Sequence, residues 1–264
     1  MLSKIFLIAL VASPLVHAHG KVSVATGDQG GNTTALGIQG GVIPGAGPNK
    51  ETEVDTTVFN RLAAATDGLG KTKAGPNTLD GMSAVIAQSG STLPQVSASG
   101  GSISGTLHVV TTDGAGPYTA IVDPTGTGAF SQGTKADVTT QVPGRRGNIA
   151  APKQRRFIPR MLVKIGIMKR AANVNEDFPI AVQVPAGTTC TGTVGGQSNV
   201  CLMKLVNPSA AGPFGGVIAF QMADAASGGT AAANGTATTA EATTADNAQT
   251  EKGKREFIGA KFRV

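Results

Sequence analysis

The stretch that decides the fold is Gly101-Ser-Ile-Ser-Gly-Thr-Leu-His-Val-Val-Thr111. Read as an extended strand, its alternation places His108 on the face opposite three apolar residues, Ile103, Leu107 and Val109. Turn residues follow at 113–117, and residues 118–122 have the pattern of a returning strand. The stretch therefore predicts a β-hairpin with His108 near its open face.

The rest of the chain repeats this pattern of short strands and long turns. Glycine is abundant, at 37 residues, and helix-forming residues are sparse among Thr, Val and Gly. One short helix is expected within residues 51–65, where apolar side chains recur at helical spacing. Further strands are expected at residues 19–24, 136–142, 178–184, 200–206 and 215–222. We therefore expect a mainly β protein, an antiparallel β-sandwich of immunoglobulin or fibronectin type with long Gly-rich loops.

The chain divides into three expected parts. Residues 1–18 have the features of a secretory signal peptide, with an apolar run and a cleavage site after Ala18. Residues 19–224 form the predicted β-sandwich domain. Residues 225–264 are expected to be a disordered tail, because 20 of the 26 residues from 225 to 250 are Ala, Thr or Gly. The protein is thus expected to be secreted, and extracellular or associated with the cell wall or cell surface.

Cleavage after Ala18 would make His19 the first residue of the mature chain. An N-terminal histidine can chelate one metal ion through its free amine and its ring Nδ1, because the amine has an ordinary pKa near ~7.7–8.0 and yields its proton to a divalent metal. His17 would leave with the signal peptide, so His108 is the one other imidazole of the mature chain. The pair predicts a surface-open metal site at His19 and His108.

Copper is the metal that this ligand set favours. Cu(II) stands at the top of the affinity order of divalent metals, and a tetragonal arrangement of nitrogen ligands favours it over Zn(II). We expect one copper ion per chain, held by the His19 amine, the His19 imidazole and the His108 imidazole.

The two cysteines, Cys190 and Cys201, are expected to form a disulfide, since a secreted chain folds in an oxidising compartment. A bond that closes so short a loop would fasten one hairpin region and would not organise the whole fold. The residues from 145 to 170 carry nine Lys or Arg and no acid. A solvated strand-and-loop face is the favoured interpretation of this stretch; a patch for acidic polymers or phospholipid headgroups and a processing region are the alternatives.

Other classes of function find little support. The sequence lacks the Gly-x-Ser-x-Gly elbow, the His-Glu-x-x-His helix, the P-loop and the dinucleotide fingerprint. After the signal peptide no apolar run approaches the length of about 20 residues that a membrane span requires. A nucleic-acid partner is not expected for a secreted chain with so few aromatic residues.

Three stretches resemble the Egh-type secreted virulence factors of pathogenic fungi, also called appressorium-specific cell-surface proteins. They are Ala18-His19-Gly20, the segment from Thr106 to Tyr118, and the segment from Cys201 to Pro208 followed by Gly212-Pro-Phe-Gly-Gly-Val. The resemblance covers residues 1 to about 224. It implies a secreted fungal protein linked to host penetration.

The chain also resembles, more weakly, the lytic polysaccharide monooxygenases and their copper-binding relatives. In that group an N-terminal His and a second His form a copper site called the histidine brace, which His19 and His108 match. The resemblance implies an axial aromatic residue, for which Phe220 and Tyr118 are the candidates, and copper-dependent oxidation of polysaccharide. The chain departs from the group in having no Trp and a single Tyr. The alternative is a non-catalytic extracellular or cell-surface protein that serves adhesion, wall binding or host penetration.

Overall fold

The computed structural model describes residues 20–38, 55–90, 92–150 and 173–223. The predicted signal peptide at 1–18, His19, most of the basic stretch and the segment 225–264 lie outside the described residues. Within the described part of the chain, no helix has the length and the apolar character that crossing a membrane requires.

The described chain is mainly β, as the sequence predicts. Its strands form an antiparallel sheet whose main path runs β2-β1-β7-β10-β9-β8-β12-β13-β3-β4-β5. The longer strands are β1 (Gly20–Gly27), β7 (Ser102–Thr111), β8 (Thr119–Asp123), β9 (Thr134–Thr140), β10 (Asn173–Gln183), β12 (Gln197–Val206) and β13 (Phe214–Met222). The shorter strands are β2 (Gly30–Thr33), β3 (Thr57–Val58), β4 (Lys71–Thr72), β5 (Gly75–Pro76), β6 (Gln95–Val96) and β11 (Gly192–Val194).

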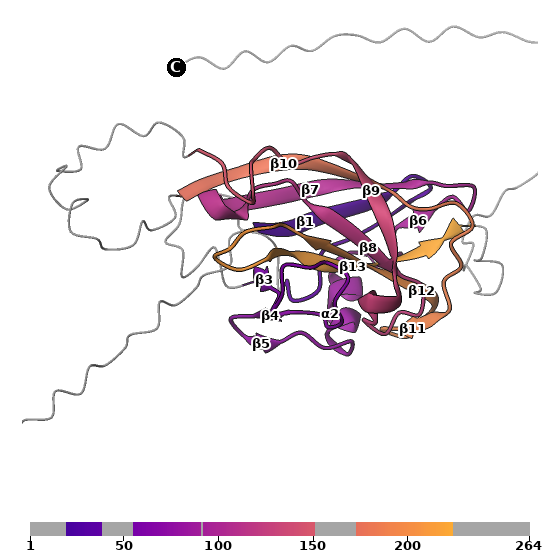
Figure 1. Ribbon diagram of the computed structural model, residues 1–264. Coiled ribbons are helices and arrows are strands. Elements are labelled where there is room, and N and C mark those ends of the chain that lie inside the picture. The colour runs from indigo at the N-terminus through magenta and orange to yellow at the C-terminus, as the bar shows by residue number, and fades with distance from the viewer. Residues whose placement is uncertain (1–19, 39–54, 91, 151–172, 224–264) are drawn as a thin grey trace, which may run out of the picture. The chain divides into compact units, whose positions relative to one another are not determined.

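The sheet curls so that its two halves face each other. One half holds β2, β1, β7 and β10, the other holds β8, β12 and β13, and β9 pairs with a strand of each half. Figure 1 shows β10, β7 and β1 in one layer, with β12 and β13 in the layer below. Apolar side chains from both inner faces form one buried core, which includes Val22, Leu107, Ile180, Met203 and Ile218.

The second half is buried on its outer face as well. There a short helix, α2 (Gly81–Gln88), and the loops around it cover β12 and β13. Met82, Val85 and Ile86 of α2 join a second apolar cluster with Leu202 and Val217 from the two strands. Strands that are covered on both faces have continuous apolar sequences, which is why the sequence alone predicts β12 and β13.

The predicted hairpin between β7 and residues 118–122 is wrong. Both segments are strands, but β7 pairs with β1 and β10, whereas β8 pairs with β12 and β9. A short 3-10 turn, η1 (Thr112–Gly114), lies between the two strands and carries the chain from one half of the sheet to the other. Alternation of side chains identifies a strand, but it does not identify the strand's partner.

The expected helix within residues 51–65 is also wrong over the part that the structure describes, residues 55–65. Thr57–Val58 forms β3, which pairs with β13, and the Phe59 N–H donates a hydrogen bond to the Pro213 carbonyl. Phe59 is buried in the second cluster, whereas Leu62 is exposed. Pairing with β13 therefore overrides the local helical spacing of the apolar residues.

The predicted disulfide between Cys190 and Cys201 is confirmed. Cys201 lies in β12, and Cys190 lies just before β11, which pairs with β12 in an antiparallel manner. Both cysteines are buried in the core between the two halves. The bond therefore fastens the β11–β12 hairpin, as expected from the short loop.

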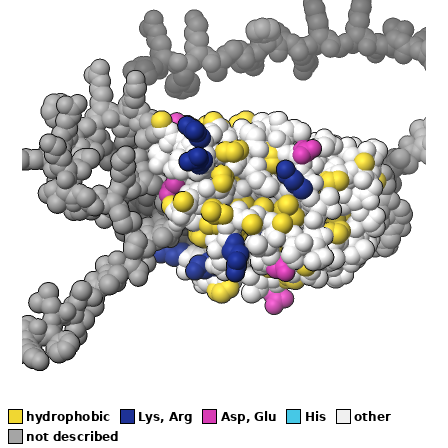
Figure 2. All heavy atoms as spheres, in the orientation of Figure 1, with side chains coloured by type: hydrophobic (Ala, Val, Ile, Leu, Met, Phe, Trp, Pro, Cys, Tyr) yellow, Lys and Arg dark blue, Asp and Glu magenta, His cyan; other side chains and the backbone are white. Residues whose placement is uncertain are grey.

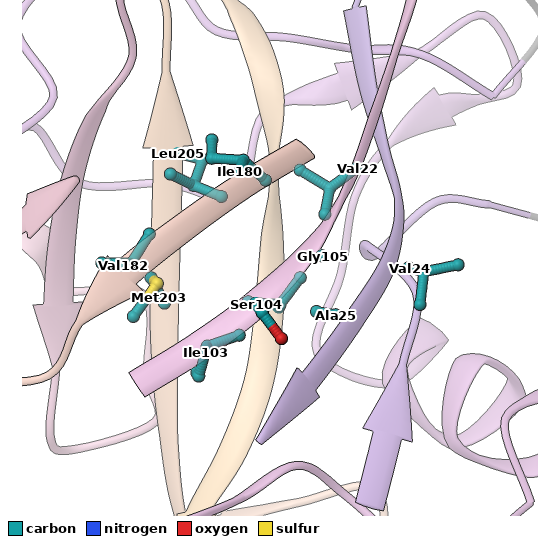
Figure 3. Close-up of a pocket in the computed structure, with 11 residues that line it drawn as sticks. Val22, Val24, Ala25, Ile103, Ser104, Gly105, Ile180, Val182, Met203 and Leu205 are labelled. Atoms are coloured by element: carbon teal, nitrogen blue, oxygen red, sulfur yellow. The ribbon is translucent and has the colours of Figure 1, made fainter. Parts of the chain in front are cut away.

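A β-bulge between Val22 and Val24 brings β1 unusually close to Gly105 of β7. Val22 and Ala25 enter the core, while Val24 is exposed and points away from it (Figure 3). The space left among these side chains and their neighbours on β10 and β12 is only about 10 Å³, room for at most a single water molecule. A methyl group at position 105 would overlap the Val24 carbonyl oxygen, so only glycine fits there.

Gly105→Ala should lower the free energy of unfolding by about 1–3 kcal/mol, because the added methyl group must push the paired backbones apart. The matched control is Gly81→Ala in α2, where the new Cβ would meet Leu36 at an ordinary 3.4 Å. Gly81 is the first residue of the helix, where propensity has less effect than in the interior, so that change should alter stability by no more than about 0.5 kcal/mol. Urea unfolding measures both variants; a Gly105→Ala protein as stable as the original would contradict the close approach.

Candidate functional site

His108 lies near the end of β7 and is buried, with 1% of its surface exposed. The expectation that it lies at an open surface is therefore wrong. On the face of the described residues that Figure 2 shows, no histidine is visible among the scattered charged side chains. His108 faces away from the central core, because its neighbours Leu107 and Val109 both point into that core.

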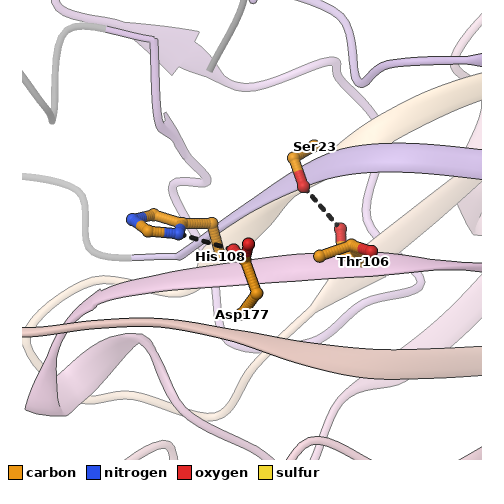
Figure 4. Close-up of polar contacts among 4 residues, drawn as sticks. All are labelled: Ser23, Thr106, His108 and Asp177. Atoms are coloured by element: carbon orange, nitrogen blue, oxygen red, sulfur yellow. Dashed lines mark hydrogen bonds and ion pairs between the residues drawn. The ribbon is translucent and has the colours of Figure 1, made fainter. Parts of the chain in front are cut away.

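The His108 ring is oriented by a carboxylate. Its Nδ1 lies 2.7 Å from Oδ1 of Asp177 on the adjacent strand β10 (Figure 4). An ionised carboxylate can only accept a hydrogen bond, so Nδ1 carries the proton and donates it. In the neutral ring this leaves the lone pair on Nε2, the arrangement in which an imidazole binds a metal ion.

The Nε2 atom of His108 is buried and has no hydrogen-bond partner among the described residues. A buried polar atom without a partner costs about 1–3 kcal/mol, so such an atom calls for an explanation. The Oδ1 atom of Asn175, two residues before Asp177, is also buried without a partner. Two unsatisfied polar atoms therefore occur on the paired strands β7 and β10, near the same end of the sheet.

Three charged or titratable side chains form a row across the sheet at this position. Lys21 of β1 pairs directly with His108, and His108 pairs directly with Asp177 of β10. Directly paired residues project to the same face of a sheet, so the row combines an amine, an imidazole and a carboxylate. Burial lowers the pKa of Lys21, and the negative charges of Asp55 and Asp177 partly oppose that shift.

Gly20, the first described residue, packs closely against Tyr118 and Gly114 on the core side of β1. A Cβ at position 20 would lie 2.5 Å from Oη of Tyr118 and 2.7 Å from the carbonyl oxygen of Gly114. These two atoms are themselves joined, since the Tyr118 hydroxyl donates a 2.7 Å hydrogen bond to that carbonyl. Only glycine fits between them and the rest of β1, which fixes the position of the residue that follows His19.

The side chain of Asn207 fixes the loop that carries Gly114. Its side-chain amide donates to the carbonyl oxygens of Asp113, at 3.0 Å, and Ala115, at 2.9 Å, on either side of Gly114. Its Oδ1 accepts a 2.8 Å hydrogen bond from the Phe214 backbone N–H. Asn207 is completely buried, so these bonds form away from water and fix the loop that contacts Gly20.

The three stretches that carry the family resemblance therefore meet at one place. Gly20 comes from the first, Gly114 and Tyr118 from the second, and Asn207 and Phe214 from the third. They build a rigid cradle around the residue that follows His19.

Neither candidate axial residue lies on the His108 face of the sheet. Tyr118 and Phe220 belong to the central core, which lies on the opposite side of β7 from His108. Burial raises the pKa of the Tyr118 phenol, and the Asp113 charge adds to the effect, so the hydroxyl stays protonated as a donor. Phe220 of β13 pairs with Cys201 of β12. The axial role of either residue stays a prediction without support from this arrangement.

The predicted ligand His19 lies outside the described residues. Within the ranges that are described, no three His, Cys, Asp or Glu side chains converge in a way that could hold a metal ion. His108 is thus the one predicted metal ligand that the structure places. Sequence reasoning missed Lys21, Asp177 and Asn207, and the only signal for any of them was the position of Asn207 within a family-like motif.

The comparisons with known proteins agree on one family. The model of the Egh16-like virulence factor family matches residues 17–215. The appressoria-specific virulence factor GAS1 of Pyricularia oryzae is 38% identical over 217 residues, which cover 81% of this chain and 76% of that protein. GAS2 of the same species is 42% identical over 127 residues, 48% of this chain and 37% of its own length. No solved structure matches the chain.

His108→Ala should lower the free energy of unfolding of the metal-free protein by about 1–3 kcal/mol, since it leaves a gap and removes the hydrogen bond to Asp177. Lys135→Ala is the control, because Lys135 is exposed on β9 and its truncation should change stability by no more than about 0.5 kcal/mol. Urea unfolding at neutral pH measures both. A His108→Ala protein that matches the control would show that the imidazole is not packed as described.

Proposed function

The chain belongs to the Egh16-like virulence factor family, and we propose that it is a secreted, virulence-associated protein whose mature N-terminus and His108 hold one copper ion. The observation that carries the proposal is the buried Nε2 of His108, which has no partner among the described residues while Asp177 holds the other ring nitrogen. A metal ion at Nε2 would satisfy the unpaired atom.

The register of β1 supports a contribution from His19. Side chains two residues apart on a strand share a face, so a strand continued by one residue puts position 19 on the face of Lys21 and His108. Gly20 pairs with Val109, so position 19 would stand diagonally across from His108. Side chains in diagonal positions have their Cα atoms about 7–8 Å apart, a separation that two imidazoles can bridge with one metal ion between them.

The chemistry of the donors supports copper. His19 would offer an amine and a ring nitrogen, and His108 would offer a neutral imidazole whose tautomer Asp177 sets. Asp177 is half exposed and Asp55 acts on Lys21 from nearby, so negative charge is available to offset an added cation. Copper bound in this way would supply one-electron redox chemistry for oxidising a carbohydrate C–H bond, with peroxide as co-substrate or with oxygen and an external reductant that provides two electrons.

The relatives support the broader part of the proposal. Two proteins named as appressoria-specific virulence factors of Pyricularia oryzae match the chain, and the longer match covers most of it. An appressorium is an organ of host penetration, so an extracellular or surface location fits these names. The signal-like residues 1–18 point the same way, since cleavage after Ala18 would release the mature chain outside the cell.

One observation favours the second candidate, a non-catalytic surface or wall-binding protein. The structure describes one Tyr and five Phe residues, and none of them is exposed: Tyr118, Phe59, Phe130, Phe214 and Phe220 are buried and Phe178 is partly buried. The described surface thus lacks the exposed aromatic rings on which flat polysaccharides stack. Copper binding without reductant-dependent consumption of oxygen or peroxide would favour this candidate.

The test of the copper site is a competitive titration of Cu(II) against a chelator, using protein that begins at His19. An extra glycine before His19 converts the amine to an amide, so affinity should fall by more than a hundredfold, and His108→Ala should also weaken binding. Asp177→Asn should cost about 10–100-fold, the effect typical of an outer hydrogen-bond partner of a ligand.

Lys135→Ala, on the exposed side of β9, is the matched control and should bind as the original protein does. Equal copper affinity in the chain with the extra glycine would overturn the proposed site.

A further inference from the structure

A pocket of about 440 Å³ lies on the outer side of the second half of the sheet, away from His108. It is formed by the segment from Phe59 to Lys71, by Pro76 of β5 and by Lys204 of β12. Its volume falls within the range of about 300–1,000 Å³ typical of sites for small molecules. The copper site proposed above uses none of these residues.

Lys204 is the unusual member of this lining, because its side chain is buried in the middle of a strand. Only 1% of the residue is exposed. The ammonium donates a 2.8 Å hydrogen bond to the Thr66 carbonyl and lies 4.4 Å from the centre of the Phe59 ring. The Phe130 ring stands 5.1 Å away on another side. Rings and a carbonyl stabilise a cation, but they do not neutralise it.

The charges that line the pocket are unbalanced. Arg61, Lys71 and Lys204 are cationic, and Asp67 is the one acidic residue in the lining. Asp67 already accepts a 2.8 Å hydrogen bond from the Ser131 backbone N–H, and this bond holds the pKa of its carboxyl below the usual range. A pocket with a surplus of positive charge at a buried ammonium is suited to an anion.

We propose that this pocket binds a carboxylate, carried by a free organic acid or by an acidic sugar, with Lys204 and Arg61 supplying the positive charges. Arg61 is exposed at the pocket and has the planar fork that fits a carboxylate with two hydrogen bonds. Phe59, Leu69 and Pro76 offer apolar surface for the rest of the ligand. Asp67 would repel a doubly charged phosphate more strongly than a singly charged carboxylate.

The protonation state of Lys204 gives a second, independent test of the proposed site. Burial lowers its pKa to about 8, and the nearby Asp67 partly opposes that shift. Arg61 and Lys71 are the other charged groups of the lining. The ammonium is charged below its pKa and neutral above it, so binding of an anion should weaken as the pH rises from 7 to 9.5.

The experiment is calorimetric titration of the full mature chain with four probes. Acetate represents a free organic acid, and a trimer of galacturonic acid represents an acidic polysaccharide. Maltotriose is the neutral trimer, and inorganic phosphate is the competing anion. We expect saturable binding of a carboxylate probe and no binding of maltotriose. Binding of acetate would assign the site to free acids, whereas binding of the acidic trimer alone would assign it to acidic polysaccharide.

Three variants decide whether the pocket is responsible. Arg61→Ala changes an exposed side chain and should weaken carboxylate binding at least tenfold. Lys204→Met keeps the buried length without the charge and should remove the loss of affinity between pH 7 and 9.5. Lys135→Ala, a cation on β9 outside the pocket, should leave binding unchanged.

Several results would overturn the proposal. These are equal binding of the acidic and neutral trimers, tighter binding of phosphate than of either carboxylate, an Arg61→Ala protein with the original affinity, or no saturable binding of any carboxylate. If Lys204→Met does not fold, Arg61→Ala and the choice of probe still decide the outcome.

Discussion

Backbone hydrogen bonding between β1 and β7 pairs Gly20 with Val109 and Lys21 with His108, and the arrangement of the site depends on this register. A shift of β1 by one residue would turn Val22 out of the core and Lys21 into it, and would separate Lys21 from His108. At the bulge between Val22 and Val24, β1 passes so close to β7 that a Cβ at position 105 would overlap the Val24 carbonyl oxygen, so this pairing requires glycine there. His108 pairs in turn with Asp177 on β10, so Lys21, His108 and Asp177 form one row across the three strands.

The cradle around Gly20 explains what the family-like stretches have in common. They lie far apart in sequence, yet the Tyr118 hydroxyl, the Gly114 carbonyl and the Asn207 amide join in one buried network beside the first described residue. Breaking one hydrogen bond in this network would leave a buried polar group unpaired, at a high cost in free energy. The network therefore keeps the start of β1 in one position. A rigid base of this kind is what a metal site at a chain terminus needs, since a terminus is otherwise the most mobile part of a chain.

Much of the fold could be predicted from the sequence, because alternation and apolar runs identify single strands such as β7, β12 and β13. The partner of β8 could not, since pairing between distant strands leaves no local signal. The helix predicted within residues 51–65 is wrong for a related reason. Pairing of β3 with β13 stabilises the extended conformation more than the weak helical preference of these residues stabilises a helix. His108 was identified by elimination, whereas its partner Asp177 lies 69 residues away and became visible only through the register. The sequence also gives no indication that Lys204, which lies within an apolar strand, lines a pocket.

Electron paramagnetic resonance of the mature chain loaded with one equivalent of Cu(II) tests the central claim most directly. The account predicts a tetragonal signal with hyperfine coupling to three nitrogens: the N-terminal amine, the His19 ring and the His108 ring. In the His108→Ala protein the coupling from one nitrogen should disappear. A spectrum that is identical in the two proteins would contradict the account, because it would mean that the β1–β7 register does not bring the N-terminus and His108 to one metal ion.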